Sequence, residues 1–319
     1  MPSCGFRPVS AASVTRAAST IRGTDVTRFQ WEDLPQAVRD AVQDHAGPVV
    51  KAETATAGLM PGVAARLHLG DGGSVFLKAC PADHPAAKLY ERELWAGRVL
   101  PAAVPTPRLR WSSTELGWIA MLHTFIDGRA VDLSPGSPDV SAVLGLVAEL
   151  GSYLTPYPGD DAPPVSGNVS ALLAKGRHLL DRGTLAEQAL YVAALDKWDV
   201  AELEGATLLH YDLHAGNLKA VGDQVFVLDW GFACQGAGWV EPVMFAPRLI
   251  EAGHTPERVE ELLMDLPAWR SAPGDGVTGL VALWTLFRLY KAMHGPEEVR
   301  DFRGRAAAAG KAWLRYRLA

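Results

Sequence analysis

Short runs of alternating hydrophobic and polar residues, separated by glycine turns, dominate the first third of the chain. Residues 63–69 and 74–78 alternate in this way on either side of a glycine-rich turn at residues 70–73. This pattern is typical of an antiparallel hairpin. The same criteria predict a second pair of strands at residues 109–111 and 118–122. We therefore expect a small antiparallel β-sheet in this part of the chain.

Beyond Gly128 the hydrophobic residues recur mainly at helical spacing. Helices are expected there at residues 140–153, 169–180 and 185–198 and from residue 242 to the end of the chain. Two further helices are expected before Gly128, at residues 31–44 and 86–100. A β-type island lies among the later helices, with a hairpin that turns near residue 222 and a strand at residues 225–229. The predicted fold class is α+β in two lobes, a small antiparallel β N-lobe at residues 26–124 and a larger, mainly helical C-lobe at residues 125–319.

The composition suits a chain that folds by itself. It has 319 residues, of which 48% are hydrophobic, enough to bury a core without disulfides or metal ions. The three cysteines, Cys4, Cys80 and Cys234, are far apart and form no CxxC motif. This spacing argues against a disulfide framework or a zinc site, and it fits a reducing, cytoplasmic setting. No apolar run reaches the roughly 20 residues of a membrane span, so we expect no membrane partner.

Residues 1–24 are rich in Ala, Ser and Arg and contain no acidic residue. We expect residues 1–25 to be a disordered extension, with a transit peptide as the alternative.

The charge balance narrows the class of partner. The chain has 30 Lys and Arg against 36 Asp and Glu, a net charge of −6. A nucleic-acid-binding protein normally presents a basic surface, so we expect no nucleic-acid partner, and a cationic or neutral small substrate suits the balance better. Several acids of the C-terminal half could receive a cationic substrate, but solvated helix faces are the simpler explanation for them. These acids are Asp160, Asp161, Glu251, Glu257, Glu260 and Glu261.

One short segment carries the residue types that phosphoryl transfer needs. The reaction requires a base or positioning group beside the acceptor hydroxyl, oxygen ligands for Mg²⁺ and a cation on the phosphates. In the segment that begins at His210, Asp212 can accept or orient the hydroxyl proton, and Asn217 can offer its amide oxygen to the metal ion. The hairpin that follows returns the chain so that Asp229 presents a carboxylate to the same ion. His214 could contact the substrate or have a structural role.

Two segments, residues 210–218 (HYDLHAGNL) and 227–230 (VLDW), resemble the catalytic loop and the metal-binding Asp-Trp pair of the aminoglycoside phosphotransferase family. That family includes choline-kinase-like enzymes and has a bilobal, protein-kinase-like fold. The resemblance implies that Asp212 is the catalytic base and that Asn217 and Asp229 bind Mg²⁺.

The resemblance also implies a nucleotide site in the N-lobe. Lys78, at the end of the predicted hairpin, would hold the α- and β-phosphates of ATP and pair with Glu93 of the following helix. Thr124 and Phe125, at the boundary between the lobes, would lie against the adenine ring. Without the resemblance, Lys78 is simply a solvated lysine at the end of a strand.

Some positions depart from the family's pattern. Tyr211 stands where the family commonly has Gly, and Glu241 occupies the place of an Asp that anchors the catalytic loop. The loop at residues 54–62 contains only two glycines, so no phosphate contact is assigned to it. No Ala-Pro-Glu sequence follows the catalytic segments, which argues against a protein kinase.

We therefore expect an ATP- and Mg²⁺-dependent phosphotransferase that transfers a γ-phosphoryl group to a hydroxyl of a small molecule, an aminoglycoside-type antibiotic or a metabolite. GTP is an alternative donor, and a monomer or weak homodimer is expected. The alternative function is a catalytically silent, kinase-like nucleotide-binding module that acts through partners. Trp284, Phe287 and Tyr290 lie at helical spacing and are expected in the core rather than in a substrate site.

Overall fold

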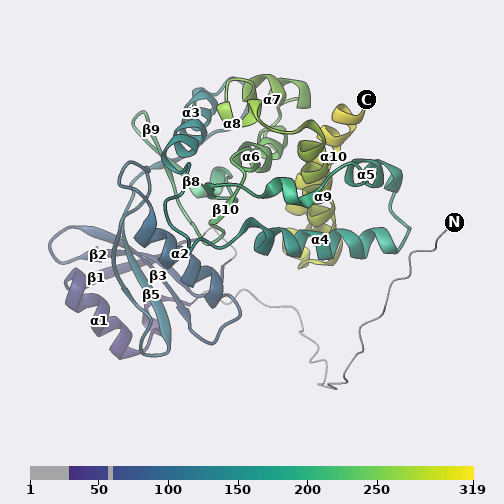
Figure 1. Cartoon of the computed structure of the whole chain (residues 1–319). Coiled ribbons are helices and arrows are strands. Elements are labelled where there is room, and N and C mark those ends of the chain that lie inside the picture. Colours follow the sequence, from purple (N-terminus) through teal and green to yellow (C-terminus); the bar gives the residue numbers. More distant parts are fainter. Residues whose placement is uncertain (1–28, 57–59) are drawn as a thin grey trace, which may run out of the picture.

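A five-stranded antiparallel sheet forms the N-terminal part of the computed structural model, which describes residues 29–56 and 60–319 (Figure 1). The strands are β1 (Val49–Thr54), β2 (Val63–Leu69), β3 (Ser74–Pro81), β4 (Leu109–Ser113) and β5 (Trp118–Thr124). Their order in the sheet is β1-β2-β3-β5-β4. Both predicted strand pairs are confirmed. The predicted extension at residues 1–25 lies outside the described residues.

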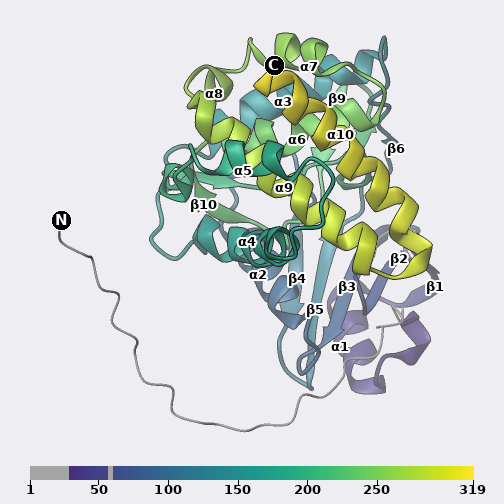
Figure 2. The same ribbon diagram turned by 90° about the vertical axis from the view of Figure 1, so that its right-hand side faces the viewer.

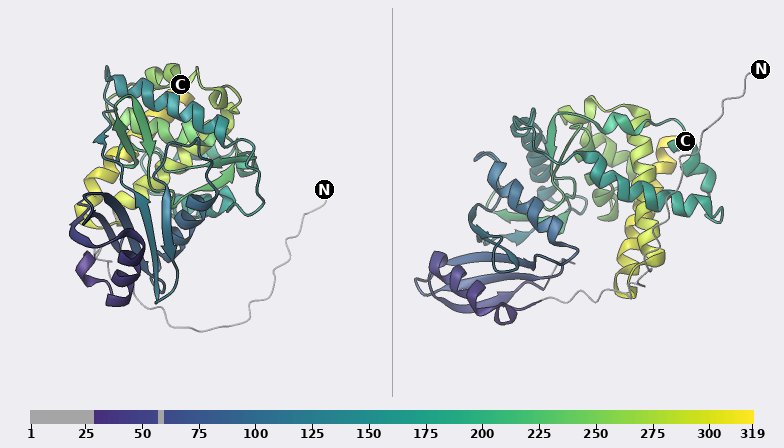
Figure 3. Two further views of the ribbon diagram at one scale, coloured as in Figure 1. Left: turned by 90° about the vertical axis from the view of Figure 1, so that its left-hand side faces the viewer. Right: turned by 60° about the horizontal axis from the view of Figure 1, so that its bottom comes forward.

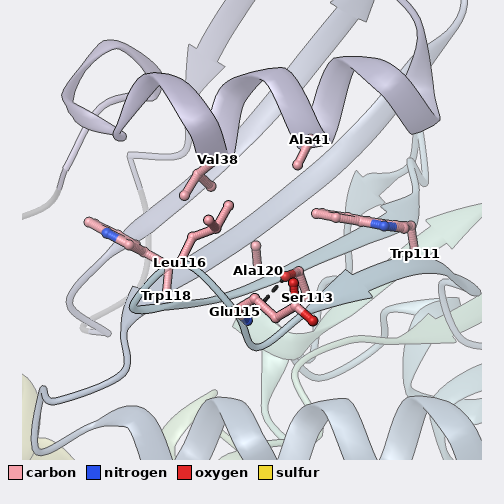
Figure 4. A pocket seen from close by; sticks show the side chains of 8 residues that line it. All are labelled: Val38, Ala41, Trp111, Ser113, Glu115, Leu116, Trp118 and Ala120. Carbon is pink, nitrogen blue, oxygen red and sulfur yellow. Dashed lines mark hydrogen bonds between the residues drawn. The ribbon is translucent and has the colours of Figure 1, made fainter.

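Helix α1 (Gln36–Ala46) covers the outer face of the sheet (Figures 1 and 2). Side chains alternate between the two faces along each strand, and on this face Ala65, Leu67 and Leu77 are buried against Val38 of the helix. The side chains leave a small pocket between α1 and strands β4 and β5 (Figure 4). It is lined by Val38, Ala41, Trp111, Ser113, Glu115, Leu116, Trp118 and Ala120. This pocket lies on the face away from Lys78.

Helix α2 (Ala87–Val99) lies on the inner face, between the sheet and the helical part of the molecule (Figure 3). Its Tyr90 packs with Met121 of β5, the residue that pairs with Lys78 of β3. Arg92 of the same helix donates a hydrogen bond of 2.6 Å to the side chain of Asn168 in the helical part. Lys78 therefore lies on the face that is turned toward the helical part.

The C-terminal part is built mainly from helices around the long helix α9. The helices are α3 (Pro138–Tyr153), α4 (Val165–Asp181), α5 (Gln188–Leu195), α6 (Val240–Glu251), α7 (Pro256–Leu263), α8 (Pro267–Arg270), α9 (Gly274–His294) and α10 (Arg300–Leu318). Two small sheets lie beside them, with β6 (Arg129–Ala130), β8 (Leu218–Val221) and β9 (Gln224–Val227) in one and β7 (Thr207–Leu209) and β10 (Cys234–Gly236) in the other. Trp284 of α9 is buried, and Phe287 and Tyr290 are half-buried against the core, as expected for a core stripe.

The α+β, two-lobed architecture predicted from the sequence is confirmed. Some element ends differ from the prediction. Pro35 precedes α1, so the stretch predicted as one helix at residues 31–44 divides into a 3₁₀ turn at Trp31–Asp33 and the helix proper. Within the described residues, none of the helices combines the length and apolar character that a membrane span requires.

Candidate active site

The loop after β7 is held by its first residue, His210. This side chain is fully buried, and its Nε2 lies 2.9 Å from the carbonyl oxygen of Leu228. Since a carbonyl oxygen can only accept, Nε2 is the donor, and Nδ1 is free to accept from the N–H of Asp212 at 3.3 Å. Burial lowers the pKa of His210, which keeps the ring neutral at physiological pH. His210 thus fixes the backbone that carries Asp212.

Tyr211 adopts a left-handed backbone conformation, with φ of 72°. A bulky residue is strained in this region, at a cost of about 1–3 kcal/mol, which is a physical reason why glycine suits the position. Glu241 of α6 holds the strained turn, because its carboxylate accepts from the N–H of His210 at 2.5 Å and from the N–H of Tyr211 at 3.1 Å. The anchoring role considered for Glu241 is therefore what the structure shows.

Asn217 and Asp229 are brought to the same loop by the β8–β9 hairpin. The side-chain Nδ2 of Asn217 donates to the backbone carbonyl of Asp212 at 3.0 Å, which directs the other side of the amide, its oxygen, away from that bond. Asp229 has a left-handed φ of 63°. This conformation ends β9 at Val227, two residues before the strand end predicted at residue 229. The turn brings the Asp229 carboxylate to Lys78 of the N-terminal sheet.

Lys78 joins the two parts of the molecule through its ammonium group. It donates to Oδ1 of Asp229 at 3.1 Å and forms an ion pair with Glu93 of α2. Burial opposes the charge on Lys78, but the carboxylates of Asp229 and Glu93 outweigh it and raise the pKa of Lys78. Glu91 is exposed, so Glu93 is the partner, as expected. The structure thus brings Lys78 and Glu93 to Asp229 and the loop at residues 210–217.

Asn217 and Asp229 fit a magnesium ion that is shared with nucleotide phosphates. Both supply oxygen atoms, and Mg²⁺ is usually held by one or two protein carboxylates together with substrate phosphates and water. Across residues 29–56 and 60–319, no group of three or more His, Cys, Asp or Glu side chains is placed to hold a metal ion. Two protein oxygen ligands match a metal ion whose remaining ligands are nucleotide phosphates and water.

Thr124 and Phe125 lie at the end of β5, where the chain leaves the sheet. The N–H of Thr124 donates to the carbonyl of Arg108 at 2.9 Å, and the hydroxyl of Thr124 accepts from the N–H of Arg108 at 2.8 Å. The ring of Phe125 lies 4.1 Å from the guanidinium of Arg66, which shares a sheet face with Lys78. Contact of Thr124 and Phe125 with adenine stays a prediction.

A sequence profile of the phosphotransferase enzyme family matches residues 64–273, which include Lys78, the loop at residues 210–217 and Glu241. The chain belongs to this family. No significant match was found among curated protein sequences.

Solved structures of phosphotransferases share this fold. The structure is similar to an aminoglycoside phosphotransferase from Alicyclobacillus acidocaldarius, with a TM-score of 0.60, 14% identity and coverage of 89% of this chain and 95% of that chain. It is similar to choline kinase LicA from Streptococcus pneumoniae, with a TM-score of 0.59, 13% identity and coverage of 87% and 98%. It is also similar to a thermostable mutant of APH(4)-Ia in complex with ADP and hygromycin B, with a TM-score of 0.57, 17% identity and coverage of 87% and 99%. The predicted protein-kinase-like fold is confirmed.

The sequence did not point to Arg248, which the structure of this phosphotransferase family member places beside the loop at residues 210–217. Its Nη2 lies 4.0 Å from Oδ1 of Asp212, and its Nη1 lies 3.3 Å from Glu251. Burial raises the pKa of Asp212, although Arg288 and Arg248 act in the opposite direction. A signal was present in the sequence, since Arg248 lies between Pro247 and Leu249 in a helix whose other residues are mostly apolar.

His214 has a structural role, one of the two roles expected for it from the sequence. Its Nδ1 accepts from the N–H of Gly216 at 3.0 Å, which starts the 3₁₀ turn at Ala215–Asn217. Its Nε2 lies 3.8 Å from Asp212, too far for a hydrogen bond. Burial, together with Arg248 and Arg288, lowers the pKa of His214 to about 4, so the ring is neutral at physiological pH.

Proposed function

We propose that this chain is an ATP- and Mg²⁺-dependent phosphotransferase that transfers the γ-phosphoryl group to a hydroxyl of a small molecule. The proposal rests on the hydrogen bond between Lys78 and Asp229. It forms beside the loop in which the side chain of Asn217 donates to the backbone carbonyl of Asp212. Phosphoryl transfer depends on positioning and charge stabilisation rather than on covalent chemistry. These side chains are of the types that such a site requires.

Each residue has a role in this proposal. Asp212 orients the acceptor hydroxyl and takes up its proton, and the pKa of Asp212, raised by burial, suits a proton acceptor. Lys78 holds the nucleotide phosphates, and Glu93 keeps the lysine in place. Asn217 and Asp229 would hold Mg²⁺. When bound, the metal ion neutralises charge on the phosphates.

The nucleotide is proposed to bind to residues 26–124 and the acceptor to residues 125–319. ATP is the proposed donor, since the similar APH(4)-Ia mutant was solved with ADP; GTP gains no support from the similar structures. The names of the similar proteins include an aminoglycoside phosphotransferase and a choline kinase. The proposed acceptor is accordingly a hydroxylated antibiotic or metabolite.

An ATP-consumption screen over hydroxylated antibiotics and metabolites tests this function against a catalytically silent nucleotide-binding module. Asp212→Asn is the blank, and Asp223→Asn, the same change in the exposed β8–β9 turn, is the matched control. We expect at least one acceptor to drive ATP consumption in the unaltered chain and the control. Asp212→Asn should lower that rate by about 100-fold or more while it still binds ADP and Mg²⁺. If Asp212→Asn is as fast as the control, Asp212 is not the catalytic base; if ADP binds and no acceptor reacts, the silent module is favoured.

A further inference from the structure

Two arginines from neighbouring helices lie beside Asp212. Arg248 of α6 is only 7% exposed and approaches Asp212 to 4.0 Å. Arg288 belongs to α9, which contacts α6 (Figure 1). The guanidinium carbons of Arg248 and Arg288 lie 5.4 and 4.9 Å from the ring centroid of the same buried side chain, Trp284. Both guanidinium groups therefore contact one indole ring, and they lie close enough for each charge to act on the other.

The hydrogen-bonding groups of this arginine pair are largely unused. Arg288 forms no hydrogen bond and no ion pair with any described residue, and its guanidinium lies over the rings of Trp284 and Phe287. Arg248 makes a long contact of 3.3 Å with Glu251. The Nε atoms of both arginines are buried and have no partner within the described part of the chain. The side chain of Arg248 is only 7% exposed, and a buried donor such as its Nε is costly without a partner, so its retention points to a ligand that completes it.

Further cations face the same place from adjacent elements. Arg303 of α10 and Lys291 of α9 interact electrostatically with Arg288. The carboxylates that face Arg288 are those of Asp212 and Glu251. The cations therefore outnumber the acids, and Asp212 is needed for the acceptor hydroxyl. A local excess of positive charge in a chain of net charge −6 is not explained by composition.

We propose that Arg248 and Arg288 bind an oxyanion, a carboxylate or a phosphate group, on the acceptor itself. The inference rests on the proposed function and narrows it: the acceptor is a small hydroxylated molecule whose anionic group lies a few bonds from the reacting hydroxyl. A guanidinium presents paired N–H donors that match both kinds of oxyanion. An aminoglycoside or choline would instead bring positive charge toward Arg248 and Arg288, so cationic acceptors are disfavoured.

Anion binding can be measured without knowledge of the natural acceptor. Thermal unfolding is followed with malonate or inorganic phosphate, each compared with chloride at equal ionic strength. Saturating ADP and Mg²⁺ occupy Lys78 throughout. We expect at least one of the two anions to raise the Tm of the unaltered chain by about 2 °C or more. Arg288→Gln should lose this rise, and Arg258→Gln, the same change at an exposed arginine of α7, should keep it.

The two anions separate the two chemistries. A rise with malonate alone indicates an acceptor carboxylate, and a rise with phosphate alone indicates an acceptor phosphate. No anion-specific rise in the unaltered chain, or an equal rise in Arg288→Gln, overturns the proposal.

The stability of the unliganded variant separates ligand binding from support of the fold. Arg288→Gln should unfold at the same Tm as the unaltered chain or above it, because the half-buried Arg288 has no ion pair with a described residue to lose and its repulsion by Arg248 and Arg303 is removed. If its Tm falls by several degrees while that of Arg258→Gln does not, Arg288 supports the fold and the proposal is wrong.

Acceptors found in the ATP-consumption screen give a kinetic readout. Arg288→Gln should raise KM for anionic acceptors by about 10- to 100-fold and leave neutral acceptors unchanged. An equal loss of kcat with every acceptor would instead place Arg288 on the transferred phosphoryl group and overturn the proposal. If malonate binds through Arg288 but no acceptor is phosphorylated, the anion site stands and the proposed function fails.

Discussion

Replacing Glu241 with glutamine should stabilise the chain above pH 7 and leave its stability nearly unchanged at pH 5. Burial raises the pKa of Glu241 from 4.5 to about 7, although the N–H groups of Tyr211 and His210 act in the opposite direction. A carboxyl with a raised folded-state pKa contributes stability below its unfolded pKa, and that stability is lost as the pH rises through the folded value. At 1.36 kcal/mol for each pKa unit, the loss between pH 4.5 and 7 is about 3 kcal/mol.

Glutamine keeps an oxygen acceptor for the two backbone N–H groups but does not titrate. The free energy of unfolding in urea should therefore be compared between Glu241→Gln and the unaltered chain at pH 5 and at pH 8. The difference in favour of Glu241→Gln should be about 3 kcal/mol larger at pH 8 than at pH 5. Glu115→Gln, the same change in the exposed turn between β4 and β5, is the matched control. If the differences between Glu241→Gln and the unaltered chain are the same at both pH values, the carboxylate is not buried beneath the loop as described.

Glu241→Ala removes the acceptor altogether. The N–H groups of His210 and Tyr211 would then be buried without partners, at about 1–3 kcal/mol each. We expect Glu241→Ala to be less stable than Glu241→Gln at both pH values. Hydrogen exchange should show these two amides losing protection while the amides of β3 keep theirs. Unchanged protection of both amides in Glu241→Ala would show that another group holds the loop.

Three further changes test other parts of the structure. Tyr211→Phe should raise the free energy of unfolding by about 1 kcal/mol, because the Tyr211 hydroxyl is buried without a partner within the described residues; a lower Tm would contradict this. Burial and Lys78 lower the pKa of His123 from 6.5 to about 4, so between these pH values the unfolded state binds more protons than the folded state. As the pH falls from 6.5 to 4, the free energy of unfolding of His123→Gln should therefore fall by about 3 kcal/mol less than that of the unaltered chain. Lys78→Met should cost about 3 kcal/mol in urea unfolding, because it leaves Glu93 buried without its partner. Adding Glu93→Leu should restore stability but not nucleotide binding, and a double variant as unstable as Lys78→Met alone would contradict this pairing.

Local patterns were sufficient to predict the elements that position the site. The alternation of residues 63–69 and 74–78 fixes which side chains share a face, so the strand position of Lys78 followed from the sequence. Asp212, Asn217 and Asp229 could be found because the first two lie in one short loop and a single hairpin returns the chain to the third. The end of β9 was missed because the left-handed φ of Asp229 has no local signal, unlike a glycine at such a position.

The arginine pair could not be predicted because its members meet only in the folded chain. Arg248 and Arg288 lie on helices far apart in sequence, and each helix by itself shows ordinary periodicity. Their proximity depends on how α6 and α9 pack around Trp284, which periodicity does not specify. Net charge favoured a cationic or neutral substrate instead, because it sums the charges of the whole chain and carries no information about which of them lie close together in the fold.

Phosphorus NMR of a reaction with ATP and Mg²⁺ is the most direct test of the proposed phosphoryl transfer. The unaltered chain and Asp223→Asn should produce ADP together with a phosphomonoester resonance when the acceptor is present. Asp212→Asn should bind the nucleotide and give neither product above background. ADP with inorganic phosphate alone, whichever acceptor is supplied, would contradict phosphoryl transfer to an acceptor. A phosphomonoester formed equally well by Asp212→Asn would contradict the assignment of Asp212.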